Sequence, residues 1–235
     1  MHNSHIPADV IARVTARRGK EHIHDDLSPT KTALVVVDMQ NAFMPHPVAH
    51  APCAMAPKIV PQINALAKVV RDTGGVVVWI QTACTPGDKI TWSNAHNIVT
   101  HERAEKRFAA LARGSEGYAL YKEMDAQPQD LYVEKHRFSA FIQNSSDLDG
   151  ILREKGIDTV LIAGTVTNVC CESTARDAMM LNYKVVMLSD CNAADNDDEH
   201  NASLRAIYLQ FGDVMDSNMV ADILQRRSNA RVAAE

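Results

Sequence analysis

The sequence has little aromatic content, no run of positive charge and no long hydrophobic stretch. Aromatic residues make up 5% of the 235 residues, and the formal net charge is -5. An acidic chain without a basic cluster does not fit nucleic acid or an anionic membrane surface as a partner. No apolar segment approaches the roughly 20 residues of a membrane span, and residues 1–10 lack the apolar core of a signal peptide. We therefore expect a cytoplasmic protein.

The sequence also lacks the spacing patterns of three common kinds of site. No Gly-x-Gly-x-x-Gly follows any predicted strand, which argues against a flavin or dinucleotide protein. The cysteines show neither the spacing of a disulfide framework nor that of a zinc site, so a reducing compartment and no metal are expected. No cofactor is expected either. The five cysteines are Cys53, Cys84, Cys170, Cys171 and Cys191.

The residues that are present predict one α/β domain preceded by an arm. With 46% hydrophobic residues the chain can bury a full core, and apolar β-branched runs alternate with segments of helical periodicity. This alternation predicts right-handed βαβ units, a mainly parallel six-stranded sheet and helices on both of its faces, in three layers. The predicted strands are residues 33–37, 76–80, 131–134, 158–162, 184–188 and 213–215, and the predicted helices are 59–70, 102–112, 147–155, from 168 onward, 197–210 and 217–226.

Residues 1–31 form the arm and residues 32–235 the domain. Val10, Ile11 and Val14 predict a short amphipathic helix that packs on the body or on a neighbouring subunit. The arm is also rich in histidine, which is compatible with a metal tract, but a solvated extension is the favoured interpretation. These histidines are His2, His5, His22 and His24.

The segment around Cys170 organises the rest of the chain. A buried strand ends near Gly164, which tolerates unusual dihedral angles, and Thr167 or Asn168 is suited to capping the helix that follows. Cys170 would then lie in the first helical turn, where the helix dipole and free N–H groups favour a thiolate and can hold an oxyanion. The alternative is that Cys170 is a small buried hydrophobic residue.

Ligands of open α/β sheets bind at the carboxyl ends of the strands, and reactive side chains follow several strands here. Asp38, Lys135 and Cys170 bring an acid, an amine and a thiol to one edge. Each has a structural alternative: Asp38 as a cap of the next turn, Lys135 as a solvated strand end, Cys170 as packing. For Asp190, which ends the fifth predicted strand, the structural role is favoured because Asp is a common turn former.

Three of these strand ends resemble the isochorismatase-like cysteine hydrolase family. The motifs are DMQN at residues 38–41, KHRFSAF at 135–141 and GTVTNVC at 164–170, in that order. The resemblance covers residues 32–226 and implies the Rossmann-like strand order of that family. The run TNVCCESTARD at 167–177 is most similar to the ureidoacrylate amidohydrolase branch.

The resemblance implies a catalytic triad. Carried over position by position, Cys170 is the nucleophile, Asp38 the general base and Lys135 the third member. The family's cis peptide bond falls between Val166 and Thr167, where it aims the N–H groups of Thr167 and Cys170 at an oxyanion. Cys171 is interpreted as a packing residue.

The reaction implied is hydrolysis of a C–N bond through a thioester with release of ammonia. Lys135 and the helix terminus are expected to lower the pKa of the thiol, and Asp38 to take its proton. Nicotinamidases of this fold carry an Asp-x-His metal motif where this chain has QTACT at residues 81–85, and isochorismatases proper lack the cysteine. Of the activities in this family, the one that remains is metal-independent hydrolysis of a small ureido, carbamoyl or amide substrate. N-carbamoyl amino acids, biuret, maleamate and nicotinamide-type amides stay open, as does a catalytically idle binding protein.

The sequence gives weaker signals for the substrate-binding residues and for the oligomeric state. Trp92, in a long irregular stretch, is a candidate lid residue, and Arg137 a candidate for a substrate carboxylate. His46 and His50 follow the Asp38 motif in a proline-rich loop, where a surface role is favoured over substrate contact. A homo-oligomer, dimer or tetramer, is expected from the family. The predicted substrate-binding residues are Phe43, Gln81, Thr82, Trp92, Arg137, Phe138, Phe141 and Gln210.

Overall fold

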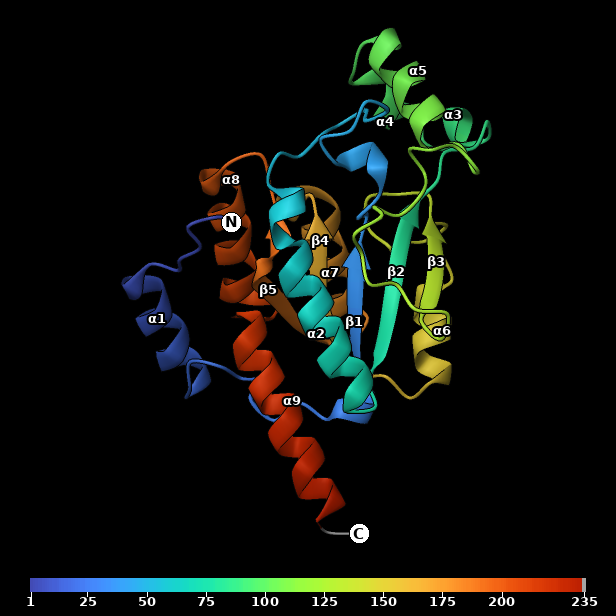
Figure 1. Cartoon of the computed structure of the whole chain (residues 1–235). Helices are drawn as coiled ribbons and strands as arrows, with labels where there is room; N and C mark the ends of the chain where they lie inside the picture. The colour runs from blue at the N-terminus through green and yellow to red at the C-terminus, as the bar shows by residue number, and fades with distance from the viewer. Residues whose placement is uncertain (234–235) are drawn as a thin grey trace.

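The computed structural model describes residues 1–233 and contains a single parallel sheet in that range. Its six strands have the order β3-β2-β1-β4-β5-β6, and every neighbouring pair is parallel. The predicted α/β class and Rossmann-like order are therefore confirmed (Figure 1). The strands are β1 (Thr32–Val37), β2 (Val76–Thr82), β3 (Leu131–Lys135), β4 (Thr159–Thr165), β5 (Lys184–Ala193) and β6 (Asp213–Met215).

The helices form two layers, one on each face of the sheet, and a separate group above the carboxyl ends of the strands. Side chains of β1 alternate between the layers. Val35 packs in the cluster that contains residues of α6 (Leu148–Glu154), α7 (Glu172–Met180) and α8 (Asp197–Ala206), whereas Val36 packs in the cluster that contains residues of α2 (Val60–Asp72) and α9 (Ser217–Val232). Strands buried on both faces are continuous in apolar residues, which is why the sequence predicts them well. The helices are α1 (Ala8–Arg18), α2 (Val60–Asp72), α3 (Asp88–Thr91), α4 (Ser93–Asn97), α5 (His101–Ala110), α6 (Leu148–Glu154), α7 (Glu172–Met180), α8 (Asp197–Ala206) and α9 (Ser217–Val232).

Residues 88–110, the roof segment, hold α3, α4 and α5. Figure 1 shows these helices standing above the carboxyl ends of the strands, away from the two helical layers. The stretch before α5 was predicted to be irregular, but it forms the short helices α3 and α4. The roof segment thus covers the sheet edge where ligands bind in this class of fold.

Two predicted helices contain wider turns than expected. The segment Thr167–Cys171 is a π-helical turn that leads into α7, and Ile207–Phe211 is a second one that ends α8. Such single π turns occur frequently at functional sites. The first of them carries Cys170, and the second carries Gln210.

Gly164 allows β4 to approach β1 closely at the carboxyl edge. It pairs with Val37 and has a φ of 118°, a conformation that glycine adopts at little cost. A Cβ atom at this position would lie 2.0 Å from the Val37 carbonyl oxygen. Only glycine therefore fits where the strand bearing Asp38 meets the strand leading to Cys170.

The arm is packed on the C-terminal half of the body. Val10 and Val14 of α1 are buried in the cluster that includes Tyr208, whose hydroxyl donates a hydrogen bond to the Glu21 carbonyl at 2.9 Å. His22 Nδ1 lies 2.9 Å from a carboxylate oxygen of Asp213. Within residues 1–233 no three His, Cys, Asp or Glu side chains are arranged to hold a metal ion. No helix in this part of the chain is both long and apolar enough to cross a membrane.

Candidate active site

The parallel register of β1, β2 and β3 brings Asp38, Thr82 and Lys135 together at the carboxyl ends of these strands. Asp38 directly follows β1, and its N–H donates to the Ile80 carbonyl of β2 at 3.0 Å. Thr82, the last residue of β2, pairs in register with Lys135, the last residue of β3. The three side chains therefore come from neighbouring strand ends.

The ammonium of Lys135 lies between Asp38 and Thr82. Lys135 Nζ is 2.9 Å from Asp38 Oδ2 and donates a hydrogen bond of 2.6 Å to Thr82 Oγ1. The Thr82 hydroxyl in turn donates to Asp38 Oδ1 at 2.8 Å. Lys135 and Asp38 are fully buried, and a buried charge without a partner is strongly destabilising. Each charge therefore depends on the other.

Asp38 acts on the Cys170 thiol as well as on Lys135. Lys135 Nζ lies 2.9 Å from Asp38 Oδ2, and the negative charge of Asp38 also acts on the Cys170 thiol, whose pKa it helps to raise. Asp38 is thus the carboxylate placed to accept a proton from this thiol.

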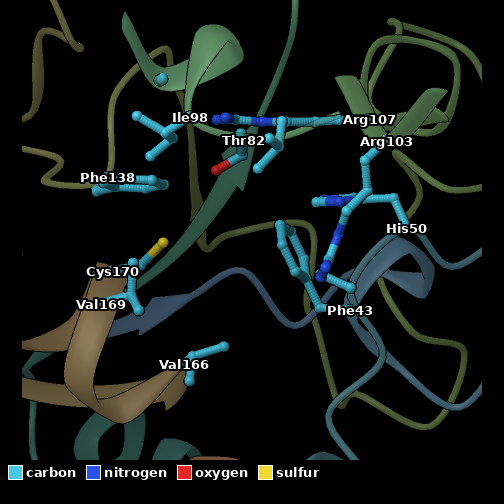
Figure 2. Close-up of a pocket in the computed structure, with 13 residues that line it drawn as sticks. Phe43, His50, Thr82, Ile98, Arg103, Arg107, Phe138, Val166, Val169 and Cys170 are labelled. Carbon is cyan, nitrogen blue, oxygen red and sulfur yellow. The ribbon is translucent and has the colours of Figure 1, made fainter. Parts of the chain in front are cut away.

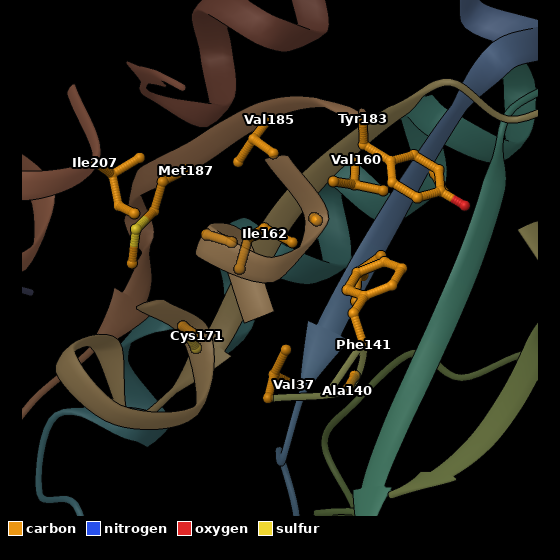
Figure 3. Packing of buried hydrophobic residues seen from close by; sticks show 14 of the residues in the cluster. Val37, Ala140, Phe141, Val160, Ile162, Cys171, Tyr183, Val185, Met187 and Ile207 are labelled. Atoms are coloured by element: carbon orange, nitrogen blue, oxygen red, sulfur yellow. The ribbon is translucent and has the colours of Figure 1, made fainter. Parts of the chain in front are cut away.

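Cys170 presents its thiol to a cavity, whereas Cys171 does not. Cys170 lines the cavity and is 6% exposed, and Figure 2 shows its sulfur directed into the open space. Cys171 is fully buried, and its sulfur lies 3.9 Å from the Ala163 carbonyl oxygen in the core (Figure 3). The two adjacent cysteines therefore differ in access to a substrate.

Burial and the neighbouring charges favour the protonated form of the Cys170 thiol. Burial raises the pKa of Cys170 to about 12, the positive charge of Lys135 opposes this rise, and Asp38 adds to it. Burial alone would lower the pKa of Lys135, but Asp38 and Cys170 raise it above its ordinary value, so Lys135 stays charged. The expectation of a lowered thiol pKa is wrong here, because the depth of burial outweighs the nearby cation.

The cis peptide bond lies one residue earlier than predicted, between Thr165 and Val166. The extended strand runs through Thr165 and the π turn begins at Thr167, so Val166 alone joins the two. The Val166 carbonyl accepts hydrogen bonds from the N–H groups of Val169, at 3.1 Å, and Cys171, at 3.3 Å. Among the described backbone bonds, none runs from the Cys170 N–H to this carbonyl.

Thr167 has a supporting contact rather than a place in the cavity wall. Its side chain is fully buried, and its hydroxyl lies 3.0 Å from His200 Nδ1. Ser203 donates a hydrogen bond to the Thr167 carbonyl at 3.3 Å. Val166, its neighbour, does line the cavity. Helix α8 therefore supports the turn that carries Cys170.

The cavity measures about 220 Å³, below the roughly 300–1,000 Å³ of sites for drug-sized ligands. Phe43, Phe138 and Val169 supply apolar walls, and Thr82 contributes a hydroxyl next to the buried ion pair (Figure 2). A small ligand with an apolar portion fits these dimensions. Of the predicted site residues, those that line the cavity are Phe43, Thr82, Phe138, Val166 and Cys170.

Three predicted substrate contacts lie near the cavity but outside its lining. Gln81 donates to the Tyr118 carbonyl at 3.0 Å, and Arg137 lies 3.3 Å from Asp88 within the roof segment. The Trp92 ring packs edge-on against Phe138 with 4.8 Å between ring centroids. Trp92 therefore supports a cavity wall from behind.

Two other predicted contacts lie away from the cavity. Phe141 is buried in the core, 5.3 Å from Tyr183 between ring centroids (Figure 3). Gln210 lies within the second π turn and accepts a hydrogen bond of 3.1 Å from Arg17 of the arm. The spacing of residues in the sequence does not reveal that the side chains of Phe141 and Gln210 point away from the cavity.

Asp190 has the structural role favoured from the sequence. Strand β5 continues past it to Ala193, and its carboxylate accepts hydrogen bonds from the N–H of Ser217 at 2.8 Å and from the Ser217 hydroxyl at 2.6 Å. Ser217 is the first residue of α9. Asp190 therefore satisfies donors at the start of that helix.

Sequence reasoning missed most of the cavity's roof. The sequence did contain a signal: Arg103 and Arg107 are four residues apart in a predicted helix and therefore share a face. His50, assigned to the surface, lines the cavity, and burial followed by the charges of Arg107 and Arg103 lowers its pKa to about 3. The lining residues not predicted are His50, Ala51, Ala95, Ile98, Val99, Arg103, Arg107 and Val169.

The fold and site define a three-layer α/β protein with a cysteine thiol in a cavity at the carboxyl ends of its strands. The family model described as the isochorismatase domain matches residues 32–219. The chain therefore belongs to the isochorismatase family. It is 33% identical, over 199 residues, to the ureidoacrylate amidohydrolase RutB of Caulobacter vibrioides, an alignment that spans 79% of this chain and 88% of the relative.

Solved structures with the same fold include two hydrolytic enzymes. A cysteine hydrolase from Pseudomonas syringae pv. phaseolicola superposes with a TM-score of 0.77 and 29% identity, covering 86% of this chain and 96% of that chain. An N-carbamoylsarcosine amidase from Thermoplasma acidophilum superposes with a TM-score of 0.64 and 29% identity, covering 80% and 97%. The chain is an enzyme of this hydrolase family.

Proposed function

We propose that the protein is a cysteine amidohydrolase that cleaves a C–N bond of a small ureido or carbamoyl substrate and releases ammonia. The observation that carries the proposal is the position of Cys170 at the cavity, next to a buried Asp38–Lys135 pair whose two charges both act on the thiol. The amidohydrolase and amidase named among the relatives support the same chemistry.

The first half of the reaction transfers one proton and forms one bond. As the Cys170 sulfur attacks the substrate carbonyl carbon, its proton moves to Asp38 Oδ2, so the high thiol pKa of the empty site need not be overcome beforehand. The negative charge that develops on the carbonyl oxygen is held by backbone N–H donors of the turn, among them that of Cys170.

The second half releases ammonia and regenerates the thiol. Asp38 returns its proton to the departing nitrogen, the C–N bond breaks, and the acyl group stays on the Cys170 sulfur. For a ureido substrate this intermediate is a thiocarbamate, which water hydrolyses to a carbamate. Lys135 remains charged throughout and stabilises Asp38 and the sulfur as negative charge moves between them.

Ammonia release from a panel of ureido acids, N-carbamoyl amino acids, biuret and simple amides tests the proposal. Wild-type protein should hydrolyse at least one ureido or carbamoyl compound in the presence of a chelator. Cys170→Ala should lower kcat by roughly a thousandfold or more, as removal of a nucleophile does. Cys171→Ala is the matched control, because this cysteine is buried in the core, and it should retain activity.

Silence of the wild-type protein across the panel, together with a Cys170 that does not react with an alkylating agent at any pH, would instead favour a binding protein on this fold. Hydrolysis that survives Cys170→Ala would contradict the thiol mechanism. Residues 1–31 as a separate arm, a cytoplasmic location and a homo-oligomeric state stay predictions.

A further inference from the structure

The cavity carries two positive charges on its roof and no negative side chain. Arg103 and Arg107 both line it from α5, whereas none of its other lining residues is Asp or Glu. Figure 2 shows Arg107 extending from the α5 ribbon across the cavity, on the far side from Cys170. The site therefore has a thiol at one end and guanidinium groups at the other.

These two arginines have no ion-pair partner in the described chain, whereas Lys89 and Asp88 of the same segment do. Lys89 lies 2.7 Å from Glu105, and Arg137 lies 3.3 Å from Asp88. Neither Arg103 nor Arg107 lies within ion-pair distance of a carboxylate in the described chain, although the protein has a net charge of -5. Two unneutralised cations at a cavity of an acidic protein favour an anionic ligand.

Arg107 is held in place by aromatic rings. Its guanidinium carbon lies 4.9 Å from the Trp92 ring centroid and 5.6 Å from that of Phe138. Guanidinium groups stack on aromatic faces and still present a planar fork of N–H donors to a carboxylate. This contact also gives Trp92, which lies outside the cavity lining, a role in positioning Arg107.

We propose that Arg103 and Arg107 bind the carboxylate of the substrate, so that the enzyme acts on ureido or carbamoyl acids in preference to neutral amides. The i, i+4 spacing places both side chains on one face of α5, and a bidentate arginine–carboxylate contact is stronger than a neutral hydrogen bond. Phe43, Phe138 and Val169 line the space between the two ends and suit a short carbon chain. This inference rests on the proposed amidohydrolase function.

The test compares two ureas that differ only in charge. 3-Ureidopropionate carries a carboxylate, and propylurea has a methyl group in its place. We expect wild-type kcat/KM to be roughly a hundredfold or more higher for the acid, as measured by ammonia release. Arg107→Gln and Arg103→Gln should each raise KM for the acid by about 10–100-fold, with a smaller effect on kcat, because each removes a charge-assisted contact. Both should change propylurea hydrolysis far less.

Further variants distinguish loss of carboxylate binding from a general effect of positive charge on α5 and from misfolding of the roof segment. Lys106→Gln removes one positive charge from the same helix at an exposed residue outside the cavity lining, and it should leave KM for the acid within about twofold. Arg107→Lys keeps the charge but loses the fork and should recover only part of the loss. Arg103 makes no contact with the aromatic rings, so Arg103→Gln tests the subsite even if Arg107→Gln disturbs the roof segment.

Failure of the subsite is distinguishable from failure of the proposed function. Equal hydrolysis of both ureas, unaffected by the arginine variants, would overturn the subsite and leave the amidohydrolase intact. If the wild type hydrolyses neither urea, calorimetric binding of 3-ureidopropionate to Cys170→Ala decides: binding that Arg103→Gln weakens tenfold or more supports the subsite alone, and no binding overturns it.

Discussion

Asp38 and Lys135 form a fully buried ion pair, with 2.9 Å between Lys135 Nζ and Asp38 Oδ2. The pair joins the ends of two strands that are separated by β2, and the Thr82 hydroxyl bridges it from the strand between them. This arrangement serves the fold and the proposed chemistry at once. Substitutions at Asp38 or Lys135 should therefore affect both stability and activity.

Removing one partner of this pair should cost stability as well as activity. Lys135→Met leaves the Asp38 carboxylate buried without its cation, and we expect a loss of about 3–5 kcal/mol in the free energy of unfolding, measured by urea denaturation. The double variant Asp38→Asn, Lys135→Met should recover much of that stability and none of the activity. A loss below about 1 kcal/mol for Lys135→Met would contradict the burial described here.

Gly164→Ala should disrupt the approach of β4 to β1. The added Cβ would meet the Val37 carbonyl oxygen at 2.0 Å, in a residue with a φ of 118°. We expect a destabilisation of about 3 kcal/mol or more, because overpacking and backbone strain add. Gly114→Ala is the matched control: its φ is also positive, at 79°, but no atom lies within 4 Å of the added Cβ, so only about 1–2 kcal/mol should be lost. Equal losses of stability in the two variants would show that the close contact of Gly164 with Val37 does not add to the cost of the substitution.

The thiol of the empty enzyme should react slowly at neutral pH. Since burial raises the pKa of Cys170 to about 12, the thiolate fraction grows about tenfold per pH unit between pH 7 and 10. Alkylation of Cys170 by iodoacetamide, followed by mass spectrometry of its peptide, should accelerate in that proportion without a plateau below pH 10. A plateau near pH 7 would mean that the empty site already holds a thiolate.

Much of the fold could be predicted from the sequence, and so could the reactive side chains at the carboxyl ends of the strands, because both depend on the local pattern of apolar and polar residues. Buried parallel strands are runs of β-branched residues, and side chains that follow such strands meet at one edge. This pattern predicts that Asp38, Lys135 and Cys170 lie together at the carboxyl ends of the strands. The structural role of Asp190 followed from turn preferences.

The rest depends on long-range packing that no local pattern encodes. The roof segment brings Arg107 over the cavity only because α5 stands above the sheet edge, and the second π turn directs Gln210 toward the arm. The sign of the Cys170 pKa shift depends on how deeply the thiol is buried, which the sequence does not state. Gln210 was thus misplaced and Arg107 overlooked for the same reason.

Trapping of an acyl-enzyme tests the central claim most directly. Rapid mixing with a ureido substrate, acid quench and intact-mass spectrometry should reveal an N-substituted carbamoyl adduct, with the mass of the substrate minus ammonia, on the wild-type protein and on Cys171→Ala, and none on Cys170→Ala. Peptide mapping of the Cys171→Ala adduct should place the added mass on Cys170. An adduct that persists in Cys170→Ala, or ammonia release by Cys170→Ala at the wild-type rate, would contradict the account.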